Sequence, residues 1–152
     1  MATKVRILDL SAGNRAIWFN RKHPDCTYID KRAEVMPDLV CDSRDVLPFM
    51  AGTFDLMVFD PPHVNFGKTS NMARVYGHHT TAEIVDIIEK TSTEAHRVSR
   101  KDALMAFKWN DHDIPLPTVL KLLRGWEPLF GHLTKDGPGS KTYWCLLRRR
   151  DK

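Results

Sequence analysis

Asp60, Pro61, Pro62 and His63 directly follow FDLMVF, an apolar stretch with the pattern of a buried strand. Prolines end strands because they lack the N–H that a ladder needs. The sequence therefore predicts a carboxylate held at the edge of a sheet, followed by a rigid turn. In open α/β folds this edge is where ligands bind, and a carboxylate there offers them hydrogen-bond acceptors.

Three further acids occupy similar positions. Asp30 and Asp42 end two other strand-like stretches, and Asp9 lies one residue before the end of the first. Because the carboxyl ends of parallel strands meet at one edge, we expect these acids and Asp60 to line a single crevice. Each could instead cap the helix that follows it. Their recurrence at four successive strands favours a ligand site.

The stretch DLSAGNRA, which follows the first strand, is a turn built of small residues. Ser11, Ala12 and Gly13 allow a ligand to approach the backbone closely. Asp30, about 20 residues beyond Asp9, has the position from which a carboxylate accepts hydrogen bonds from ribose hydroxyls. We therefore expect a nucleoside that lacks a 2′-phosphate.

The same turn distinguishes between cofactors. A dinucleotide site favours G-x-G-x-x-G around its pyrophosphate, but this turn keeps only Gly13, and Arg15 stands where a glycine is common. A nicotinamide-binding protein is therefore disfavoured. A nucleoside with a cationic or zwitterionic tail suits the acidic crevice better.

The elements that must position these residues alternate along the chain. Continuous apolar runs indicate parallel strands covered on both faces. A hairpin signal, KDGPGS, separates two last strands and makes them antiparallel. The pattern predicts an α/β fold, a doubly wound sheet of five parallel strands followed by a terminal antiparallel hairpin. The expected strands are 4–10, 26–30, 38–42, 54–60, 103–109, 127–134 and 141–149.

Three segments have helical character. The clearest is 81–99, where Ile84, Ile87 and Ile88 recur at helical spacing after a threonine cap. A shorter helix is expected at 116–124, ended by Gly125. A further helix is expected at 14–22, between the first two strands.

Length and composition indicate a single domain. The 152 residues suffice for one core but not for two, so we expect one domain over residues 1–152. No apolar run approaches the ~18 residues of a membrane span, and we expect no membrane association. Three widely spaced cysteines predict a reducing, cytoplasmic location. The net charge of +4 favours an anionic partner, although the basic C-terminal end is equally well explained as a solvated tail.

With these motifs in this order, almost the whole chain resembles the class I S-adenosylmethionine-dependent methyltransferases, whose seven-stranded Rossmann-like sheet ends in an antiparallel hairpin. LDLSAGNRA is similar to the family's first motif, D/E-x-G-x-G-x-G, with Ser11 and Arg15 in place of the outer glycines. The resemblance implies S-adenosyl-L-methionine as cofactor.

The resemblance also implies how that cofactor is held. Asp9 and the backbone of Ser11–Gly13 would face the methionine moiety, and Asp30 would hold the ribose. Asp42 and the backbone of Ser43 would contact the adenine ring and its amino group.

DPPH resembles the D/N/S-P-P-Y/F/W motif of the amino-methyltransferases, which modify exocyclic amines of bases or a glutamine amide. The Asp60 carboxylate and the Pro61 carbonyl would accept the two N–H groups of the amine and aim its lone pair at the methyl group. The fourth residue normally stacks on a flipped base. His63 could stack, or could titrate as a proton acceptor.

The resemblance implies methylation of an exocyclic amine, with adenine N6 in DNA or RNA as the leading target because Asp rather than Ser heads the motif. Cytosine N4, guanine N2, a protein glutamine and a small molecule are alternatives. A catalytically silent subunit of a larger methyltransferase is a rival, motivated by the degenerate first motif and by His63.

Substrate contacts are expected mainly from the polar segment 64–79, which follows the DPPH turn and is interpreted as a mobile substrate loop. Phe66, Lys68 and Arg74 of this loop are candidate substrate residues. Trp109, at the end of a strand, could stack on a base or complete the core. No metal site is expected, because His78 and His79 are adjacent and would point apart. Without a separate recognition domain, target choice would come from the loop, a second copy of the chain or a partner subunit.

Overall fold

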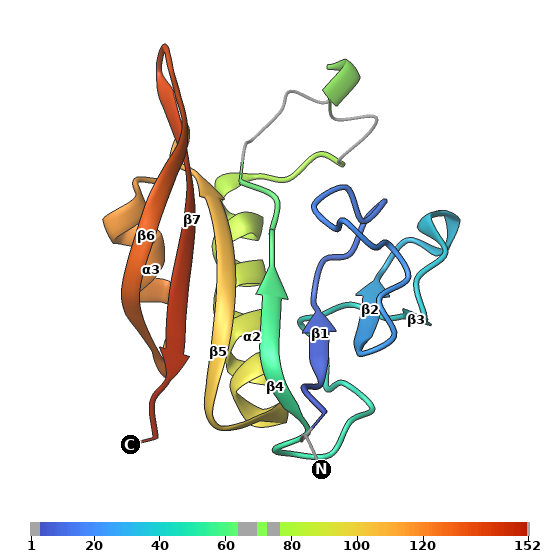
Figure 1. Cartoon of the computed structure of the whole chain (residues 1–152). Coiled ribbons are helices and arrows are strands. Elements are labelled where there is room, and N and C mark those ends of the chain that lie inside the picture. The colour runs from blue at the N-terminus through green and yellow to red at the C-terminus, as the bar shows by residue number, and fades with distance from the viewer. Residues whose placement is uncertain (1–3, 64–69, 73–76, 152) are drawn as a thin grey trace.

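The computed structural model describes residues 4–63, 70–72 and 77–151. Seven strands form one sheet in the order β3-β2-β1-β4-β5-β7-β6 (Figure 1). The strands are β1 (Ile7–Asp9), β2 (Cys26–Asp30), β3 (Leu39–Val40), β4 (Phe54–Phe59), β5 (Ser99–Asn110), β6 (Trp126–Gly137) and β7 (Ser140–Arg149).

The strand directions confirm the predicted fold class. Strands β1 to β5 run parallel to one another. β7 is antiparallel to both β5 and β6, so β6 runs in the same direction as the first five strands. The terminal hairpin therefore inserts its second strand next to β5 and leaves its first strand at the edge of the sheet.

Helix α2 (Thr81–Val98) follows the expected segment closely. The Thr80 hydroxyl accepts a hydrogen bond from the Glu83 N–H, and the Glu83 carboxylate accepts one from the Thr80 N–H. This reciprocal capping box satisfies backbone donors that the first turn leaves without partners. The apolar face of the helix, with Ile84 and Ile88 fully buried, packs against the sheet.

Helix α3 (Leu116–Leu122) is short, begins beside Pro115 and contacts α2. Both helices lie on the same face of the sheet (Figure 1). The core lies between this face and the helices, where Met105, Phe107 and Trp109 of β5 are completely buried. No helix of the described residues is long and apolar enough to cross a membrane.

The helix expected at 14–22 is absent, and that prediction was wrong. The segment forms irregular turns, in which the Asn14 and Asn20 side chains accept hydrogen bonds from the N–H groups of Ala16 and Lys22. Such local side-chain acceptors compete with helical hydrogen bonding. Between β2 and β3 there is only the 3-10 turn η1 (Ala33–Val35), so not every crossover is helical.

Arg15 occupies a position in the first turn where a glycine is common. Its φ of 58° is the left-handed conformation that glycine adopts most easily. The guanidinium lies 4.0 Å from the centre of the Tyr28 ring and donates to the carbonyls of Arg21 (2.7 Å) and Met36 (3.0 Å). These contacts offset the backbone cost and tie the 14–22 turns to the segment after β2.

Several strand boundaries differ from expectation, and β6 continues beyond 134 to Gly137. β1 is shorter than 4–10 and ends at Asp9 itself, and β3 is reduced to two residues at the sheet edge. β5 begins at Ser99 rather than 103, because Ser99 already pairs with Phe54 before an irregularity in the register.

Candidate active site

The turns after β1 and β4 are joined at the carboxyl edge of the sheet. The Asp60 N–H donates a 2.9 Å hydrogen bond to the Ser11 hydroxyl, and the Leu10 N–H donates to the carbonyl of Val58. Because β1 and β4 are neighbours in the sheet, this places DPPH beside the small-residue turn. The structure therefore brings two of the sequence motifs into direct contact.

A cluster of polar and aromatic groups surrounds Asp60. Lys108 Nζ, from the end of β5, lies 3.2 Å from Asp60 Oδ2, and His63 Nδ1 lies 4.0 Å from Asp60 Oδ1. His63 Nδ1 is also 3.1 Å from the Pro61 carbonyl oxygen. Both acceptors assigned to the amine, the Asp60 carboxylate and the Pro61 carbonyl, therefore lie at one place and already contact donors of the protein.

His63 is held against the core by Trp109, whose ring centre is 5.9 Å from the imidazole in an edge-on arrangement. Burial lowers the pKa of His63, and the nearby Asp60 carboxylate opposes that shift only in part. This shift favours the neutral imidazole at neutral pH.

Trp109 itself does not face a substrate. Its side chain is completely buried, and its indole Nε1–H donates to the carbonyl of Ile114 at 2.8 Å. Of the two roles considered for Trp109, completion of the core agrees with this burial and stacking on a base does not. Its role is to complete the core beneath His63.

Asp9 is almost fully buried below the first turn. Its Oδ2 accepts a 2.7 Å hydrogen bond from Trp18 Nε1, and its Oδ1 accepts one from the Ser11 N–H at 3.1 Å. Burial raises the pKa of Asp9 to about 6, while the bonds from Trp18 and Ser11 act in the opposite direction. Asp9 thus connects the small-residue turn to the irregular segment that replaces the expected helix.

Asp30 ends β2 and faces the same turn. Its carboxylate accepts a 2.9 Å hydrogen bond from the Gly13 N–H and two from the Arg32 guanidinium, at 3.0 and 3.1 Å. Burial would raise the pKa of Asp30, but these hydrogen bonds outweigh it and hold the pKa below its ordinary value. Asp30 is therefore an ionised acceptor directly opposite the Gly13 backbone.

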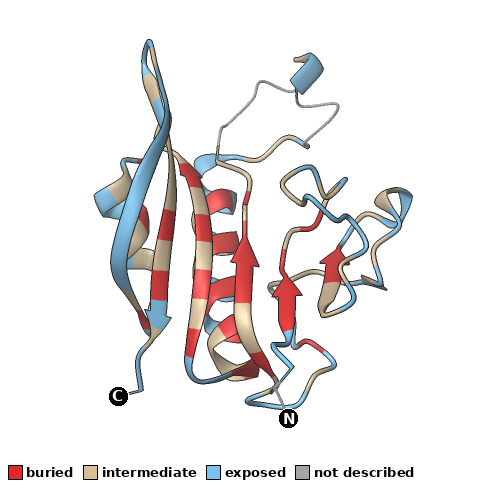
Figure 2. Ribbon diagram, in the orientation of Figure 1, coloured by how far each residue is buried: buried red, intermediate tan, exposed pale blue. Residues whose placement is uncertain are grey.

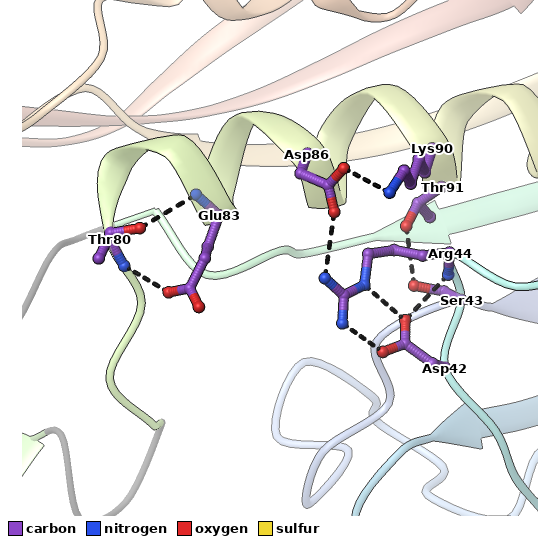
Figure 3. A network of polar contacts seen from close by, with 8 residues as sticks. All are labelled: Asp42, Ser43, Arg44, Thr80, Glu83, Asp86, Lys90 and Thr91. Carbon is purple, nitrogen blue, oxygen red and sulfur yellow. Dashed lines mark hydrogen bonds and ion pairs between the residues drawn. The ribbon is translucent and has the colours of Figure 1, made fainter.

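Asp42 belongs to a second network, which joins the end of β3 to helix α2 (Figure 3). The Arg44 guanidinium donates to Asp42 at 2.7 and 3.0 Å and to Asp86 at 3.1 Å. The Ser43 hydroxyl lies 2.8 Å from that of Thr91. Hydrogen bonds from Arg44 lower the pKa of Asp42. Asp42 and Ser43 are thus fixed by α2 rather than by the first turn.

Asp30 and Asp42 share a local hydrogen-bonding pattern that the sequence interpretation missed. In each case an arginine two residues later, Arg32 or Arg44, donates both its backbone N–H and its guanidinium to the acid. The repeated D-x-R spacing, DKR and DSR, was a visible signal for these pairs. The contacts of Lys108 with Asp60 and of Trp18 with Asp9 were missed as well. Strand pairing brings the first pair together, and the irregular turns bring the second together.

Some expected site residues lie outside the described ranges. Phe66, Lys68 and Arg74 are among them, and so is most of the 64–79 segment interpreted as a substrate loop. Within the described ranges, no group of three or more His, Cys, Asp or Glu side chains is arranged to hold a metal ion.

Two surface hollows lie away from the DPPH turn. One of about 590 Å³ is lined by the irregular 14–23 segment and by residues of β2 and the segment after it, including Tyr28 and Met36. The other, of about 270 Å³, lies between the Arg44–Val46 segment and helix α2. Neither is lined by Asp60 or His63.

No family model matches the sequence, and no curated protein matches it either. Solved structures do. A TehB-like SAM-dependent methyltransferase from Corynebacterium glutamicum is 16% identical, with a TM-score of 0.64 over 99% of this chain and 83% of that one. The N-methyltransferase NodS from Bradyrhizobium japonicum WM9 is 12% identical, with a TM-score of 0.62 over 97% and 86%.

A third similar structure is that of an rRNA methyltransferase. It is the T. thermophilus 16S rRNA N2 G1207 methyltransferase RsmC, in complex with AdoMet and guanosine; it is 13% identical, with a TM-score of 0.56 over 100% of this chain and 37% of that one. Together with the strand order, these matches show that the chain has the Rossmann-like fold of the class I S-adenosylmethionine-dependent methyltransferases. The similar proteins act on varied substrates, among them a small molecule and ribosomal RNA.

Proposed function

We propose that the protein is an S-adenosylmethionine-dependent N-methyltransferase that acts on an exocyclic amine, with adenine N6 of DNA or RNA as its target. The observation that carries this proposal is the position of the Asp60 carboxylate and the Pro61 carbonyl. They lie together at the carboxyl edge of the sheet and are bonded through Ser11 to the small-residue turn.

The residues around that turn fit the cofactor. Asp30 is an ionised acceptor in the position of a ribose partner, and the Gly13 backbone, with φ of 50°, lies directly beside it. A Cβ at Gly13 would come within 3.4 Å of Arg32 Nη2, so the absence of a side chain keeps the approach open. Asp30 already accepts four hydrogen bonds, which fill the about four lone-pair sites of a carboxylate, so ribose hydroxyls would replace those from the Arg32 guanidinium. Asp42 and Ser43 would bind the adenine end, and Ser11–Gly13 the methionine end.

Cofactor binding supplies an electrophilic methyl group; the remaining work falls to this chain. An amine attached to a base is a weak nucleophile, since its lone pair is delocalised into the ring. Asp60 Oδ1 would accept one of its N–H groups, because Oδ2 is already bonded to Lys108. The Pro61 carbonyl would accept the other. The following Pro62 restricts ψ of Pro61, so this carbonyl keeps its direction. The two acceptors would aim the lone pair at the methyl group, as electrostatic preorganisation requires.

His63 would stack on the target base. The support is its lowered pKa, which favours the neutral ring, its position against Trp109 and its place two residues after the second acceptor, Pro61. Its Nδ1 is oriented toward the Pro61 carbonyl, which suits a donor to that carbonyl better than a proton acceptor from the substrate. A stacked base must be unpaired or flipped to reach this position.

Nucleic acid is favoured as substrate by the net charge of +4 and by the fold it shares with an rRNA methyltransferase. Target choice would come from the 64–79 loop with Phe66, Lys68 and Arg74, from a second copy of the chain, or from a partner subunit. The test is incubation with labelled S-adenosylmethionine and separate pools of DNA, RNA and protein. Label in adenine N6 of nucleic acid supports the proposal; label only in protein or in no pool overturns it.

A second candidate function is a silent subunit with the methyltransferase fold. The specific observation in its favour is that arginines already bond to both cofactor-side acids, Asp30 through Arg32 and Asp42 through Arg44. Calorimetry separates the two, because an enzyme must bind S-adenosylmethionine, whereas a subunit in which Arg32 and Arg44 permanently block these acids shows no heat of binding.

A further inference from the structure

The described helices leave one face of the sheet uncovered at β5, β7 and β6, and we call it the open face. In Figures 1 and 2 helices α2 and α3 lie behind the sheet, and β5, β7 and β6 present their other face with no described helix in front of it. The irregular 10–25 segment covers the β1 end of this face, where Val58 is 6% exposed. Toward β6 the exposure increases, and Phe130 is 70% exposed.

The strand register shows which side chains line this open face. On β5, buried Phe107 and Trp109 point to the helices, so the alternate residues Ala106 and Lys108 point the other way. Gly131 of β6 lies on the helix side, because a Cβ there would meet the Cys145 sulfur at 2.9 Å. Its neighbours on either side, Phe130 and His132, therefore belong to the open face.

Two rows of side chains cross the three strands. Lys108 pairs with Trp144, and Trp144 with His132. In the next row on the same face, Ala106 pairs with Leu146, and Leu146 with Phe130. We call these six residues the platform; they are Ala106, Lys108, Phe130, His132, Trp144 and Leu146.

The platform is continuous with the candidate active site. Lys108 is the first residue of one row, and its ammonium group lies 3.2 Å from the Asp60 carboxylate. The row then leads through Trp144 to His132 at the sheet edge. A polymer whose reacting group sits at Asp60 would therefore lie along this row as it leaves the site.

The chemistry of the platform fits a single-stranded nucleic acid. Phe130, Trp144 and His132 offer flat rings on which bases stack, and stacking tolerates any base sequence. All six platform residues are described and none is an acid; the one cation among them, Lys108, is paired with Asp60. Glu127, at the start of β6, is bonded to Arg148 at 2.7 Å. A duplex keeps its bases stacked on one another and could not use these rings.

We propose that the platform binds the nucleotides that flank the methylated base, and that the substrate is therefore a single strand. This rests on the proposed function for the identity of the reacting base. Binding of a strand to the platform needs neither cofactor nor methyl transfer, so the two proposals can fail separately.

The test is fluorescence anisotropy of the full chain without cofactor. The probes are fluorescein-labelled adenine-containing 12-mers of RNA and of DNA, each single-stranded and annealed to its complement. Phe130→Ala and Trp144→Ala are compared with wild type. Met50→Ala and Phe19→Ala remove apolar side chains at least as exposed but away from the platform, and serve as controls. Unchanged circular dichroism establishes that each variant is folded, and Phe130→Tyr keeps a ring where an alanine variant does not.

The expected result is tighter binding of single strands than of duplexes. Each platform alanine should weaken single-strand binding by about 5- to 150-fold, from ~1–3 kcal/mol per stacked base, while Phe130→Tyr and both controls leave it unchanged. Equal binding of duplex and single strand, or platform variants that bind like wild type, overturns the proposal. So does a wild-type dimer that the platform variants break, measured by light scattering, because a second copy would then cover this face.

The outcome also separates the two proposals. Platform binding without label transfer to any nucleic acid contradicts the proposed reaction and leaves the platform intact. Methylation of a duplex that platform variants do not impair supports the reaction and rejects the platform.

Discussion

The backbone N–H of Asp60 donates to the hydroxyl of Ser11, 2.9 Å away and 49 residues earlier in the chain. This bond joins the turn that would hold the cofactor to the turn that would hold the amine. Relative placement of two reacting groups has large effects on rate, so the Ser11 hydroxyl, together with the pairing of β1 and β4, would set the geometry of the candidate site.

Ser11→Ala should lower kcat more than it raises KM. The Asp60 N–H loses its acceptor, at a cost of about 1–3 kcal/mol if no water replaces it, and Asp60 shifts relative to the first turn. Ser11→Thr keeps a hydroxyl and should recover most of the rate. Steady-state kinetics of both variants provide the measurement; an alanine variant with wild-type kcat would show that this bond has no part in catalysis.

Asp60→Ala should abolish methyl transfer while leaving S-adenosylmethionine affinity within a few-fold, because Asp60 serves the incoming amine. The loss should appear in kcat, as for an interaction that strengthens in the transition state. Asp55→Ala is the matched control, since Asp55 lies at the other end of β4, beside Arg6 and Arg100. Unchanged turnover of Asp60→Ala would rule out the amino-methyltransferase mechanism.

Asp30→Ala should weaken S-adenosylmethionine binding by about 1–3 kcal/mol, the scale for lost hydrogen bonds to a charged group. Asp25→Ala, at the opposite end of β2 and paired with Lys4, should leave it unchanged. Isothermal titration calorimetry provides the affinities. Equal affinities for the two variants would remove Asp30 from the cofactor site.

His63 distinguishes stacking from proton transfer. If the ring stacks, His63→Phe should retain activity and His63→Ala should lose roughly 1–3 kcal/mol in transition-state stabilisation. Because burial lowers the His63 pKa, any imidazole titration in the rate of the wild type should lie below the ordinary pKa of 6.5. Phenylalanine as damaging as alanine would instead assign His63 a proton-accepting role.

Asp9 should make the stability of the fold depend on pH. Its folded pKa of about 6 exceeds the ordinary 3.8, so between these values the folded state binds more protons than the unfolded state. The contribution of Asp9 is therefore most favourable below about pH 4 and declines as pH rises toward 6. Relative to Asp9→Asn, wild type should lose on the order of 3 kcal/mol between pH 4 and 7, from about 1.4 kcal/mol per unit of pKa difference.

Urea unfolding of wild type and Asp9→Asn at several pH values measures this difference. The comparison removes the pH dependence common to both proteins, as well as any constant loss from the missing acceptor for Trp18 or Ser11. A difference in the free energy of unfolding that does not change between pH 4 and 7 would contradict the raised pKa.

The sequence by itself determined the elements whose signals are local. The continuous apolar run FDLMVF, the Thr80–Glu83 capping box with Ile84 and Ile88 behind it, and the KDGPGS hairpin each specify their own conformation through short-range periodicity, capping and turn chemistry. The order of acids at strand ends likewise follows from parallel strands sharing one edge. These features were enough to predict the fold class, which the strand order confirms.

Only the tertiary structure decided which partners these groups meet. Trp18 bonds to Asp9 across a segment whose helical pattern is overridden by Arg15 and by local asparagine acceptors. Adjacent side chains of a strand point to opposite faces of the sheet. Lys108 faces Asp60, so the adjacent Trp109 points into the core. Such contacts depend on the register of strands far apart in sequence, and one step of register reverses the face of every side chain. The open platform has the same origin: it exists because β7 pairs between β5 and β6 while both described helices pack on the opposite face.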